Sequence, residues 1–278
     1  MLFLLACTGG PESAEPEDSG EPIPTAYEVR WSTAPDPLVA GQEGTFSLQV
    51  TDQDGRPIDD LQQSHQRMIH AIFISSDLED FQHLHQEDYG SISADNLKNA
   101  SFSFPITPKL ATDYRIAFDY AHRNRYQHTE SNLTVVGEAA ALESPNLDEL
   151  SIAEDRGLRA ELSWEVPPAA GYEASWRVNI TEVESGEEVT DLVQWLGADA
   201  HMVTADIALS AVGHTHAWFP GMEDAPPGHD MPNQYTGPFV PFHYNFERAG
   251  PQKMWVQLAR ADAPDQPYLF PFVFTVAP

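Results

Sequence analysis

The sequence predicts an all-β fold of two tandem β-sandwich domains that follow a disordered tether, and three observations lead to this prediction. Apolar residues alternate with polar ones at the period of a strand, turn signals separate the alternating runs, and the second half of the chain repeats the first. The chain has 278 residues, of which 41% are hydrophobic and 10% aromatic, a composition typical of packed globular domains.

The first 25 residues carry signals of export and tethering. Residues 1–7 read MLFLLAC, and their end resembles the lipobox of bacterial lipoproteins behind a truncated-looking signal segment. The resemblance implies that Cys7, the single cysteine of the chain, is lipidated and anchors the protein in the cell envelope, at the outer membrane. Residues 8–25 are mainly Pro, Glu, Ser and Gly, so we expect a disordered linker there.

Residues 26–137 are predicted to form the first β-sandwich. Phe46, Leu48 and Val50 alternate with polar residues, and the apolar residues of segment 114–120 do the same, which places the apolar side chains of each strand on one face. Turn signals such as DQDGRP (52–57) separate these runs at the spacing of an antiparallel sandwich.

Residues 147–278 are predicted to form the second β-sandwich, with residues 138–146 as the linker between the two. Trp176, Val178 and Ile180 alternate with polar residues, whereas the sequence around the linker shows no alternation. Each half has the size of one immunoglobulin-like domain. The sequence therefore favours two tandem immunoglobulin-like β-sandwich domains.

The two halves are copies of each other. Segment 41–61 aligns with 171–192 at an offset of 130 residues, which becomes 131 after a turn and then holds to the last histidine of a shared motif. Further along, segment 102–121 aligns with 244–259, an alignment that places Ser101 opposite His243. Self-similarity at such a period is typical of a duplicated domain.

The shared motif is H-x12-H-x-H. Over its sixteen aligned positions only four residues match between the halves: Leu78 with Leu209, and the three histidines of each copy. A strand places residues i and i+2 on one face, and the turn-like SSDLED between the histidines predicts that the chain doubles back and brings the first histidine opposite the other two. The triads are His70, His83 and His85 in the first half and His201, His214 and His216 in the second.

We expect each triad to bind a metal ion, because three neutral imidazoles have little reason to gather without a ligand. Copper is the expected metal and zinc the alternative, since imidazole suits both and copper stands higher in the divalent affinity order. The affinity for the metal should decrease as the pH drops below the ordinary histidine pKa of about 6.5. Histidines that are purely structural, or that act as a proton-linked switch, remain the alternatives. Three further histidines are expected to be surface or strand residues: His65, His122 and His128.

The second triad is predicted to be the stronger metal site. A Pro- and Gly-rich segment follows His216, and thioether and imidazole groups in that segment suit copper in an oxidising compartment. The additional candidate ligands are Met222, His229, Met231 and His243.

The segments RMIHAIFISSDLEDFQHLHQED and GPFVPFHYNFERAGPQKMWVQLAR resemble the repeat of YtkA-like, copper-associated secreted bacterial proteins. The resemblance covers most of both halves, and both triads and His243 lie at positions of the family pattern. Gln86 and Ala217 replace its prolines, the second half lacks the Ser-x-Asp-Leu turn, and the first lacks the Phe-His pair.

We therefore predict an exported, membrane-tethered metal-binding protein, a binder or chaperone-like module rather than an enzyme. Its partners would be the metal ion and another periplasmic metal-handling protein, and the membrane would be contacted only through the lipid anchor. A net charge of −29 argues against nucleic-acid binding. The alternatives are an extracytoplasmic structural or adhesion module without metal, and a metal-dependent hydrolase, for which no general-base motif is evident.

Overall fold

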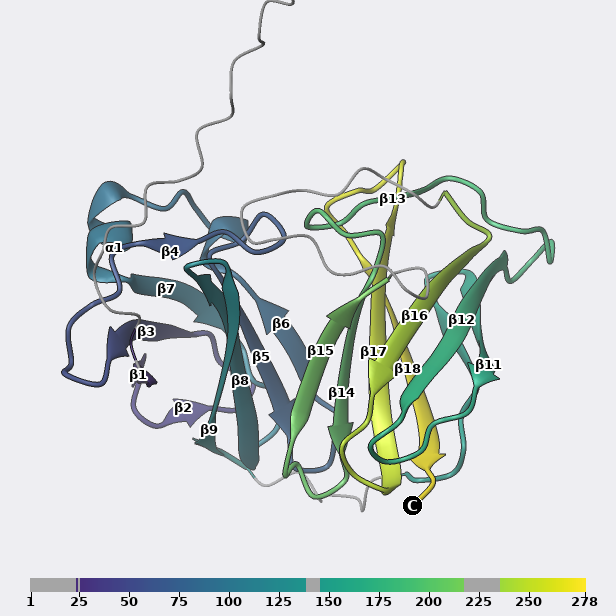
Figure 1. The fold of residues 1–278 in the computed structure, drawn as a ribbon, viewed down its shortest axis with the longest axis horizontal. Coiled ribbons are helices and arrows are strands. Elements are labelled where there is room, and N and C mark those ends of the chain that lie inside the picture. Colours follow the sequence, from purple (N-terminus) through teal and green to yellow (C-terminus); the bar gives the residue numbers. More distant parts are fainter. Residues whose placement is uncertain (1–23, 25, 139–145, 218–235) are drawn as a thin grey trace, which may run out of the picture.

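The computed structural model describes residues 24, 26–138, 146–217 and 236–278. Over these residues the chain folds into two β-sandwiches, each built from two sheets, which lie side by side (Figure 1). The prediction of an all-β fold of sandwich type is confirmed. In the described part of the chain, no helix is long and apolar enough to span a bilayer.

The first sandwich pairs a small sheet with a larger one. The small sheet has the order β1-β3-β7, and the larger sheet has the order β2-β9-β8-β5-β6, with β4 beside β8. A short helix and a 3₁₀ turn lie between β6 and β7. The bounds are β1 Tyr27–Ala34, β2 Leu38–Val39, β3 Gly44–Asp52, β4 Leu61–Gln62, β5 Ile69–Ser75, β6 Phe81–Leu84, η1 Gln86–Asp88, α1 Ala94–Asn99, β7 Ser101–Ile106, β8 Asp113–His122 and β9 Arg125–Val136.

The second sandwich has the same plan. One sheet has the order β10-β11-β12-β16, and the other has the order β13-β17-β14-β15, with β18 on β17. The bounds are β10 Ile152–Asp155, β11 Leu158–Val166, β12 Glu173–Glu182, β13 Leu192–Val193, β14 His201–Asp206, β15 Val212–His216, β16 Phe239–Asn245, β17 Gly250–Arg260 and β18 Tyr268–Val276.

The alternating residues of the sequence fill the space between the two sheets of each sandwich. Phe46 and Val50 are fully buried in the first core, and Trp176 and Val178 are fully buried in the second. Their polar neighbours on β3, such as Thr45, face outward. Period-two alternation therefore defines the core faces of β3 and β12.

Strand pairing shows which residues of the two halves are equivalent. Val203 lies 131 positions after Ile72 and is its equivalent in the second half. Ile72 pairs with Ala117, and Val203 pairs with Trp255. Ala117 and Trp255 are therefore equivalent, at an offset of 138 rather than 131.

The same offset corrects one detail of the sequence alignment. Phe46 pairs with Phe104, whereas its counterpart Trp176 pairs with Phe242. The position equivalent to His243 is therefore Pro105, and the sequence alignment of His243 with Ser101 is wrong. Residues inserted between β6 and β7, where α1 lies, or between β15 and β16 can shift the offset without altering the strands.

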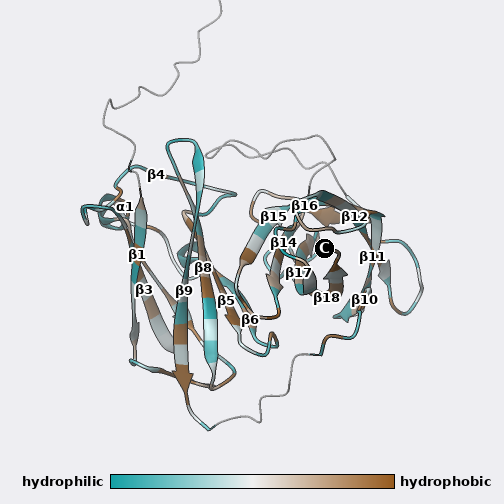
Figure 2. Ribbon diagram, turned by 60° about the horizontal axis from the view of Figure 1, so that its bottom comes forward, coloured by the Kyte–Doolittle hydropathy of each residue, from teal (hydrophilic) through white to brown (hydrophobic). Residues whose placement is uncertain are grey.

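A third apolar cluster joins the two sandwiches. It lies between β5, β6 and β8 of the first and β14, β15 and β17 of the second, where both views show these strands facing each other (Figure 2). Phe81 stacks on Trp255 with ring centroids 4.9 Å apart. Each residue that the first half contributes to this cluster has its equivalent from the second half in the same cluster. The pairs are Ile72 and Val203, Ile74 and Ala205, Leu78 and Leu209, Phe81 and Val212, and Ala117 and Trp255.

Polar contacts also cross this interface. Lys253 donates from Nζ to the carbonyl oxygen of Leu78 at 2.7 Å and pairs with Glu79 at 2.9 Å. The Val212 amide donates to Glu130 Oε1 at 2.9 Å. Since β5 and nearly all of β17 are buried, these strands contact a sandwich core on one face and the neighbouring domain on the other.

A candidate metal centre between the two domains

Two equivalent hairpins carry the histidine triads. In the β5–β6 hairpin Ala71 pairs with Leu84, so the next pair outward is His70 and His85. In the β14–β15 hairpin His201 pairs directly with His216. The remaining histidine of each motif, two residues before the last, lies on the same face. Each chain segment doubles back between its histidines, as the turn-like SSDLED of the first half indicates.

The two triads form one cluster, because both hairpins present their histidines to the interface between the domains. The centroid of the His214 ring lies 5.3 Å from that of His70 and 5.2 Å from that of His83. His70 and His201 rings lie 6.1 Å apart. We call this group of six rings the histidine cluster. The sequence predicted two separate triads and did not show that they face each other.

The first triad brings three ring nitrogens together. His70 Nδ1 lies 3.0 Å from both His83 Nε2 and His85 Nε2, and the latter two atoms are 3.1 Å apart. Nitrogens bound to one tetrahedral ion at 2.0–2.1 Å stand about 3.3 Å from each other, so this triangle has nearly the dimensions of three metal ligands.

The other nitrogen of each ring in the first triad faces a hydrogen-bond acceptor. His70 Nε2 donates to the Ser64 carbonyl oxygen at 2.9 Å, His83 Nδ1 to Gln257 Oε1 at 2.9 Å, and His85 Nδ1 to Asp88 Oδ2 at 2.8 Å. A neutral imidazole has one N–H and one lone pair. With the N–H groups on the outside, three lone pairs converge at the centre.

The second triad repeats this arrangement with wider spacing. His201 Nδ1 lies 3.4 Å from His214 Nε2, and the ligand atoms of His201, His214 and His216 lie within 4.8 Å of one another. His201 Nε2 donates to the Trp195 carbonyl oxygen at 2.9 Å, and His214 Nδ1 donates to Asp119 Oδ2 at 2.9 Å.

Two of these outer contacts cross between the domains in both directions. Asp119 of the first domain holds His214 of the second, and Gln257 of the second holds His83 of the first. Asp119 pairs with His70 and Gln257 pairs with His201, so the two orienting residues occupy equivalent positions. Outer partners of this kind fix the tautomer and direction of a ligating histidine, so each triad depends on a residue of the other domain.

Burial lowers the pKa of five of the six histidines. Burial, followed by the charges of neighbouring histidines, lowers the pKa of His70, His83, His201 and His216 well below the ordinary value. Burial also lowers the pKa of His85, although the hydrogen bond to Asp88 opposes it. These five rings are therefore neutral at neutral pH, and each offers one lone pair besides its single N–H.

The carboxylates around the cluster are ionised. Burial would raise the pKa of Asp119, but hydrogen bonds from His128 and His214 lower it well below its usual range. Burial likewise opposes ionisation of Asp88, but His85 and Arg67 lower its pKa. The hydrogen bonds of His128 to Asp119 and Glu130 outweigh its own burial and raise its pKa to about 10.

The first histidine of each triad is held by the same tight turn. Ser64 forms an isolated bridge with Arg67, and Trp195 forms one with Ala198. Both turns have two central residues with positive φ, as in type I′ turns. Their central residues are His65 and Gln66 in the first half and Leu196 and Gly197 in the second.

His65 was predicted to be a surface or strand residue, and this prediction is wrong. His65 is 5% exposed, and its ring lies over His216 of the other domain with centroids 3.6 Å apart. A seventh imidazole therefore borders the cluster. A non-glycine residue with positive φ is uncommon, but no pattern in the sequence showed that residue 65 adopts it.

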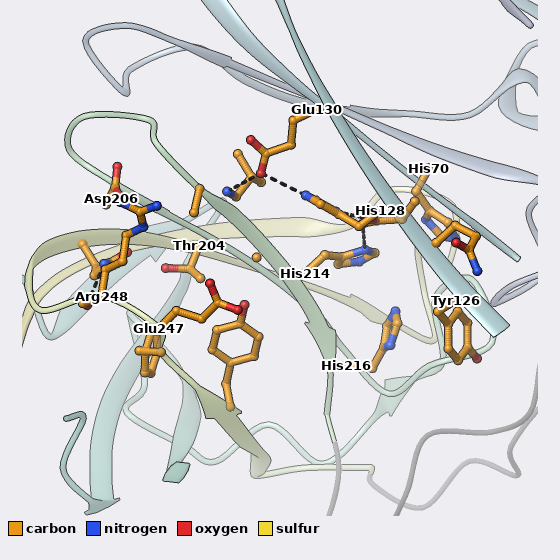
Figure 3. Close-up of a pocket in the computed structure, with 18 of the residues that line it drawn as sticks. His70, Tyr126, His128, Glu130, Thr204, Asp206, His214, His216, Glu247 and Arg248 are labelled. Atoms are coloured by element: carbon orange, nitrogen blue, oxygen red, sulfur yellow. Dashed lines mark hydrogen bonds and ion pairs between the residues drawn. The ribbon is translucent and has the colours of Figure 1, made fainter. Parts of the chain in front are cut away.

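A pocket of about 480 Å³ leads to the histidine cluster from one side. His214 and His216 of the second triad and His70 of the first line it, whereas His83, His85 and His201 do not. Figure 3 shows the histidines toward one end, near Tyr126, and Asp206, Glu247 and Arg248 toward the other. The pocket gives the second triad the larger exposure to entering ligands.

Gly213 keeps this pocket open. A side chain there would collide with the Tyr244 hydroxyl, and both residues line the pocket. The equivalent residue of the first hairpin is Gln82, whose amide instead donates to the Thr107 carbonyl oxygen at 3.0 Å. The two hairpins therefore differ in access although they share one backbone plan.

The sequence matches the family model described as Domain of unknown function (DUF8832) over residues 24–137 and 153–277, one stretch in each half. The chain belongs to this family. No curated protein matches the sequence. The family description assigns no activity, so the function of this family member has to be inferred from the site itself.

Among solved structures, the chain is similar to three larger proteins. FdeC, an adhesin of Escherichia coli, is 15% identical, with 91% of this chain and 66% of that chain covered and a TM-score of 0.26. Invasin, a bacterial integrin-binding protein, is 11% identical, with 90% of this chain and 39% of that chain covered and a TM-score of 0.24. Red sea bream transglutaminase is 10% identical, with 90% of this chain and 31% of that chain covered and a TM-score of 0.23. The chain spans less than two thirds of each, and scores this low carry no argument about function.

The remaining predicted site residues lie apart from the cluster or outside the described residues. His243 lies on β16, in the sheet opposite the triads, with Nδ1 3.4 Å from Glu173. It is not brought together with the second triad. His122 is buried at the end of β8 and contacts Asp60 and Tyr27. The predictions for Cys7, nearly all of the tether and the linker, Met222, His229 and Met231 concern residues outside the described part of the chain.

Proposed function

We propose that this protein binds transition-metal ions at the histidine cluster, copper in preference to zinc, and serves as a metal-binding or metal-carrying module of the bacterial cell envelope. The first triad supplies three imidazole nitrogens from His70, His83 and His85. The second supplies His201, His214 and His216. These six residues would hold the metal, and the bound ion would supply Lewis acidity or redox chemistry according to its identity.

The convergence of three lone pairs in the first triad is the observation that carries this proposal. Ser64, Gln257 and Asp88 accept the outer N–H groups, so no hydrogen is left to bridge nitrogens that stand 3.0–3.1 Å apart. Lone pairs at this distance repel unless a cation lies between them. A proton is disfavoured because burial lowers the pKa of all three rings.

The ligand set favours copper over other divalent metals. Imidazole nitrogen is a good ligand for both copper and zinc, and the divalent affinity order places copper above zinc. The outer hydrogen bonds resemble those that support ligating histidines in metal proteins. All six described residues of the cluster are histidines, so the proposed ligands are imidazole nitrogens and not thiolates.

Metal titration tests the proposal. The purified folded body is titrated with Cu(II) and with Zn(II), and the bound metal is counted by elemental analysis after gel filtration. We expect at least one tightly bound equivalent, lower affinity for zinc, and loss of the bound ion in His83→Gln. His243→Gln is the matched control and should retain the wild-type stoichiometry. A parent protein that binds neither metal would refute the proposal.

The alternative is an extracytoplasmic contact module without metal. Tandem β-sandwiches serve in many contexts, and the fold does not distinguish a metal carrier from an adhesion module. The absence of bound copper and zinc in the titration above would favour this alternative. Turnover of ester or phosphate substrates by the loaded protein would instead favour the hydrolase alternative, which requires metal and the pocket together.

We also propose that Cys7 carries the lipid anchor. The support is the lipobox-like sequence before it and the linker-like composition after it. A Cys7→Ser chain should move from the membrane fraction to the soluble fraction of the producing cell, while Thr8→Ser should remain with the membrane. An unmodified Cys7 in the mature protein would refute this part.

A further inference from the structure

The two triads differ in geometry although they share a scaffold. In the first triad the inner nitrogens form a triangle with sides of 3.0–3.1 Å, whereas in the second the His201–His214 distance is 3.4 Å. The first triad has an acceptor for each outer nitrogen, one of which is the ionised Asp88 held by Arg67. The close spacing of its inner nitrogens, with an acceptor behind each ring, makes the first triad a preorganised site.

A single ion cannot use the whole cluster in a four-coordinate site. The first triad fills three positions, and one further nitrogen completes the shell. His214 is the nearest candidate, because its ligand atom lies within 4.8 Å of those of His70 and His83. His201 and His216 would then remain as buried, neutral imidazoles beside the ion, directed into the same interface.

His214 also has a second set of neighbours. Its ligand atom lies within 4.8 Å of those of His201 and His216, and Asp119 holds its outer nitrogen. The ionised Asp119 offsets positive charge at the second triad as Asp88 does at the first. Each triad thus has its own three nitrogens and its own carboxylate.

We propose that the histidine cluster holds two metal ions of unequal lability: a retained ion in the first triad and an exchangeable ion in the second. This inference rests on the proposed metal-binding function. The first triad fills before the second, the reverse of the order predicted from the sequence. That prediction depended on Met222, His229 and Met231, which lie outside the described residues, and on His243, which lies in another sheet.

The pocket explains why the second ion exchanges. His214 and His216 line the pocket, whereas two of the three rings of the first triad do not. Asp206 and Glu247 lie along the same pocket, and carboxylates in a concave site raise the local concentration of cations. The open side of the second ion is therefore directed toward solvent, and a small oxygen or nitrogen donor such as water or azide can complete its shell.

The short distance between the triads implies that the two ions influence each other. His70 and His83 of the first triad approach His214 of the second within 4.8 Å, so two divalent ions would repel at close range. We expect the second ion to bind more weakly than the first. With Cu(II) in both triads, spin–spin interaction should broaden the electron paramagnetic resonance spectrum.

The experiment counts ions and measures their release. The folded protein is loaded with Cu(II), and bound copper is followed after addition of excess EDTA. We expect two equivalents, one released quickly and one slowly. His216→Gln should lose only the fast equivalent and the spectral broadening, and His85→Gln should lose the slow one. Azide should perturb the spectrum of the wild-type protein and not that of His216→Gln.

Each outcome has a distinct meaning. One equivalent in the wild-type protein, unaffected by His216→Gln, overturns the two-ion inference and leaves the proposed metal-binding function intact. Two equivalents released at one rate overturn the assignment of unequal lability. No bound copper refutes the proposed function itself. Gly213→Ser, which narrows the pocket without removing a ligand, should slow the fast phase; circular dichroism of each apo variant establishes that it is folded.

Discussion

The β5–β6 and β14–β15 hairpins show how one backbone plan supports two different sites. Both carry three histidines at the same spacing, and a turn carbonyl orients the first histidine of each. They differ in what surrounds them: Gln82 in the first hairpin is replaced by Gly213 in the second, and only the latter borders the pocket. The strands place the imidazoles, whereas neighbouring side chains determine their spacing and their access to ligands.

The largest expected effect concerns an aromatic contact between the two domains. Trp255 is 3% exposed and stacks on Phe81 across the interface. Trp255→Ala should lower the free energy of unfolding by about 3–5 kcal/mol, the usual effect of removing a buried aromatic side chain. Chemical denaturation measures this change. Tyr172→Ala, at a side chain that is 72% exposed, is the control, and an equal effect of both would show that the interface contributes little.

An intermediate effect is expected when the residues that orient the histidines across the interface are replaced. Asp119→Asn should weaken the ion in the second triad, and Gln257→Leu the ion in the first, each by about 10–100-fold. Competition with a chelator of known affinity measures both. The result to look for is the crossed pattern, in which a change in one domain weakens the ion bound by the other domain's histidines. Weakening confined to the mutated domain's own triad would contradict it.

The smallest expected effect is a dependence of apo-protein stability on alkaline pH. Hydrogen bonds to Asp119 and Glu130 raise the pKa of His128 to about 10, above the unfolded value of about 6.5. The stabilisation is therefore fully present below pH 6.5 and is lost as pH rises toward 10. Thermal unfolding at several pH values should show this decline in the parent and a flatter profile in His128→Gln. Parallel profiles would exclude His128 as its source.

Much of the fold was predictable because its signals are local. Period-two alternation identified β3, β8 and β12, and the turn-like SSDLED indicated that His70 folds back onto His83 and His85. The match of Leu78 with Leu209 was visible but unexplained. Both residues belong to the apolar cluster between the domains, so the repeated positions of the motif all lie at the interface.

The meeting of the two triads was not predicted, because it depends on contacts between segments far apart in the chain. One signal was present. β5 reads IHAIFIS and is buried at every position, and a short run without polar alternation is consistent with a strand covered on both faces. The position of His65 had no such signal, since its ring reaches His216 only through a tight turn and the packing of two domains.

The crossed contacts of Asp119 and Gln257 have a consequence for the origin of the centre. Two equivalent surfaces that contact each other reciprocally form a pseudo-isologous interface, the relation found in two-fold symmetric dimers. A chain with one repeat would thus contain every element required to build the centre: a triad, a turn carbonyl and an orienting residue for its neighbour. Two such chains would complete each other as a homodimer, whereas one polypeptide with both repeats allows the two halves to differ, as Gln82 and Gly213 do at the pocket.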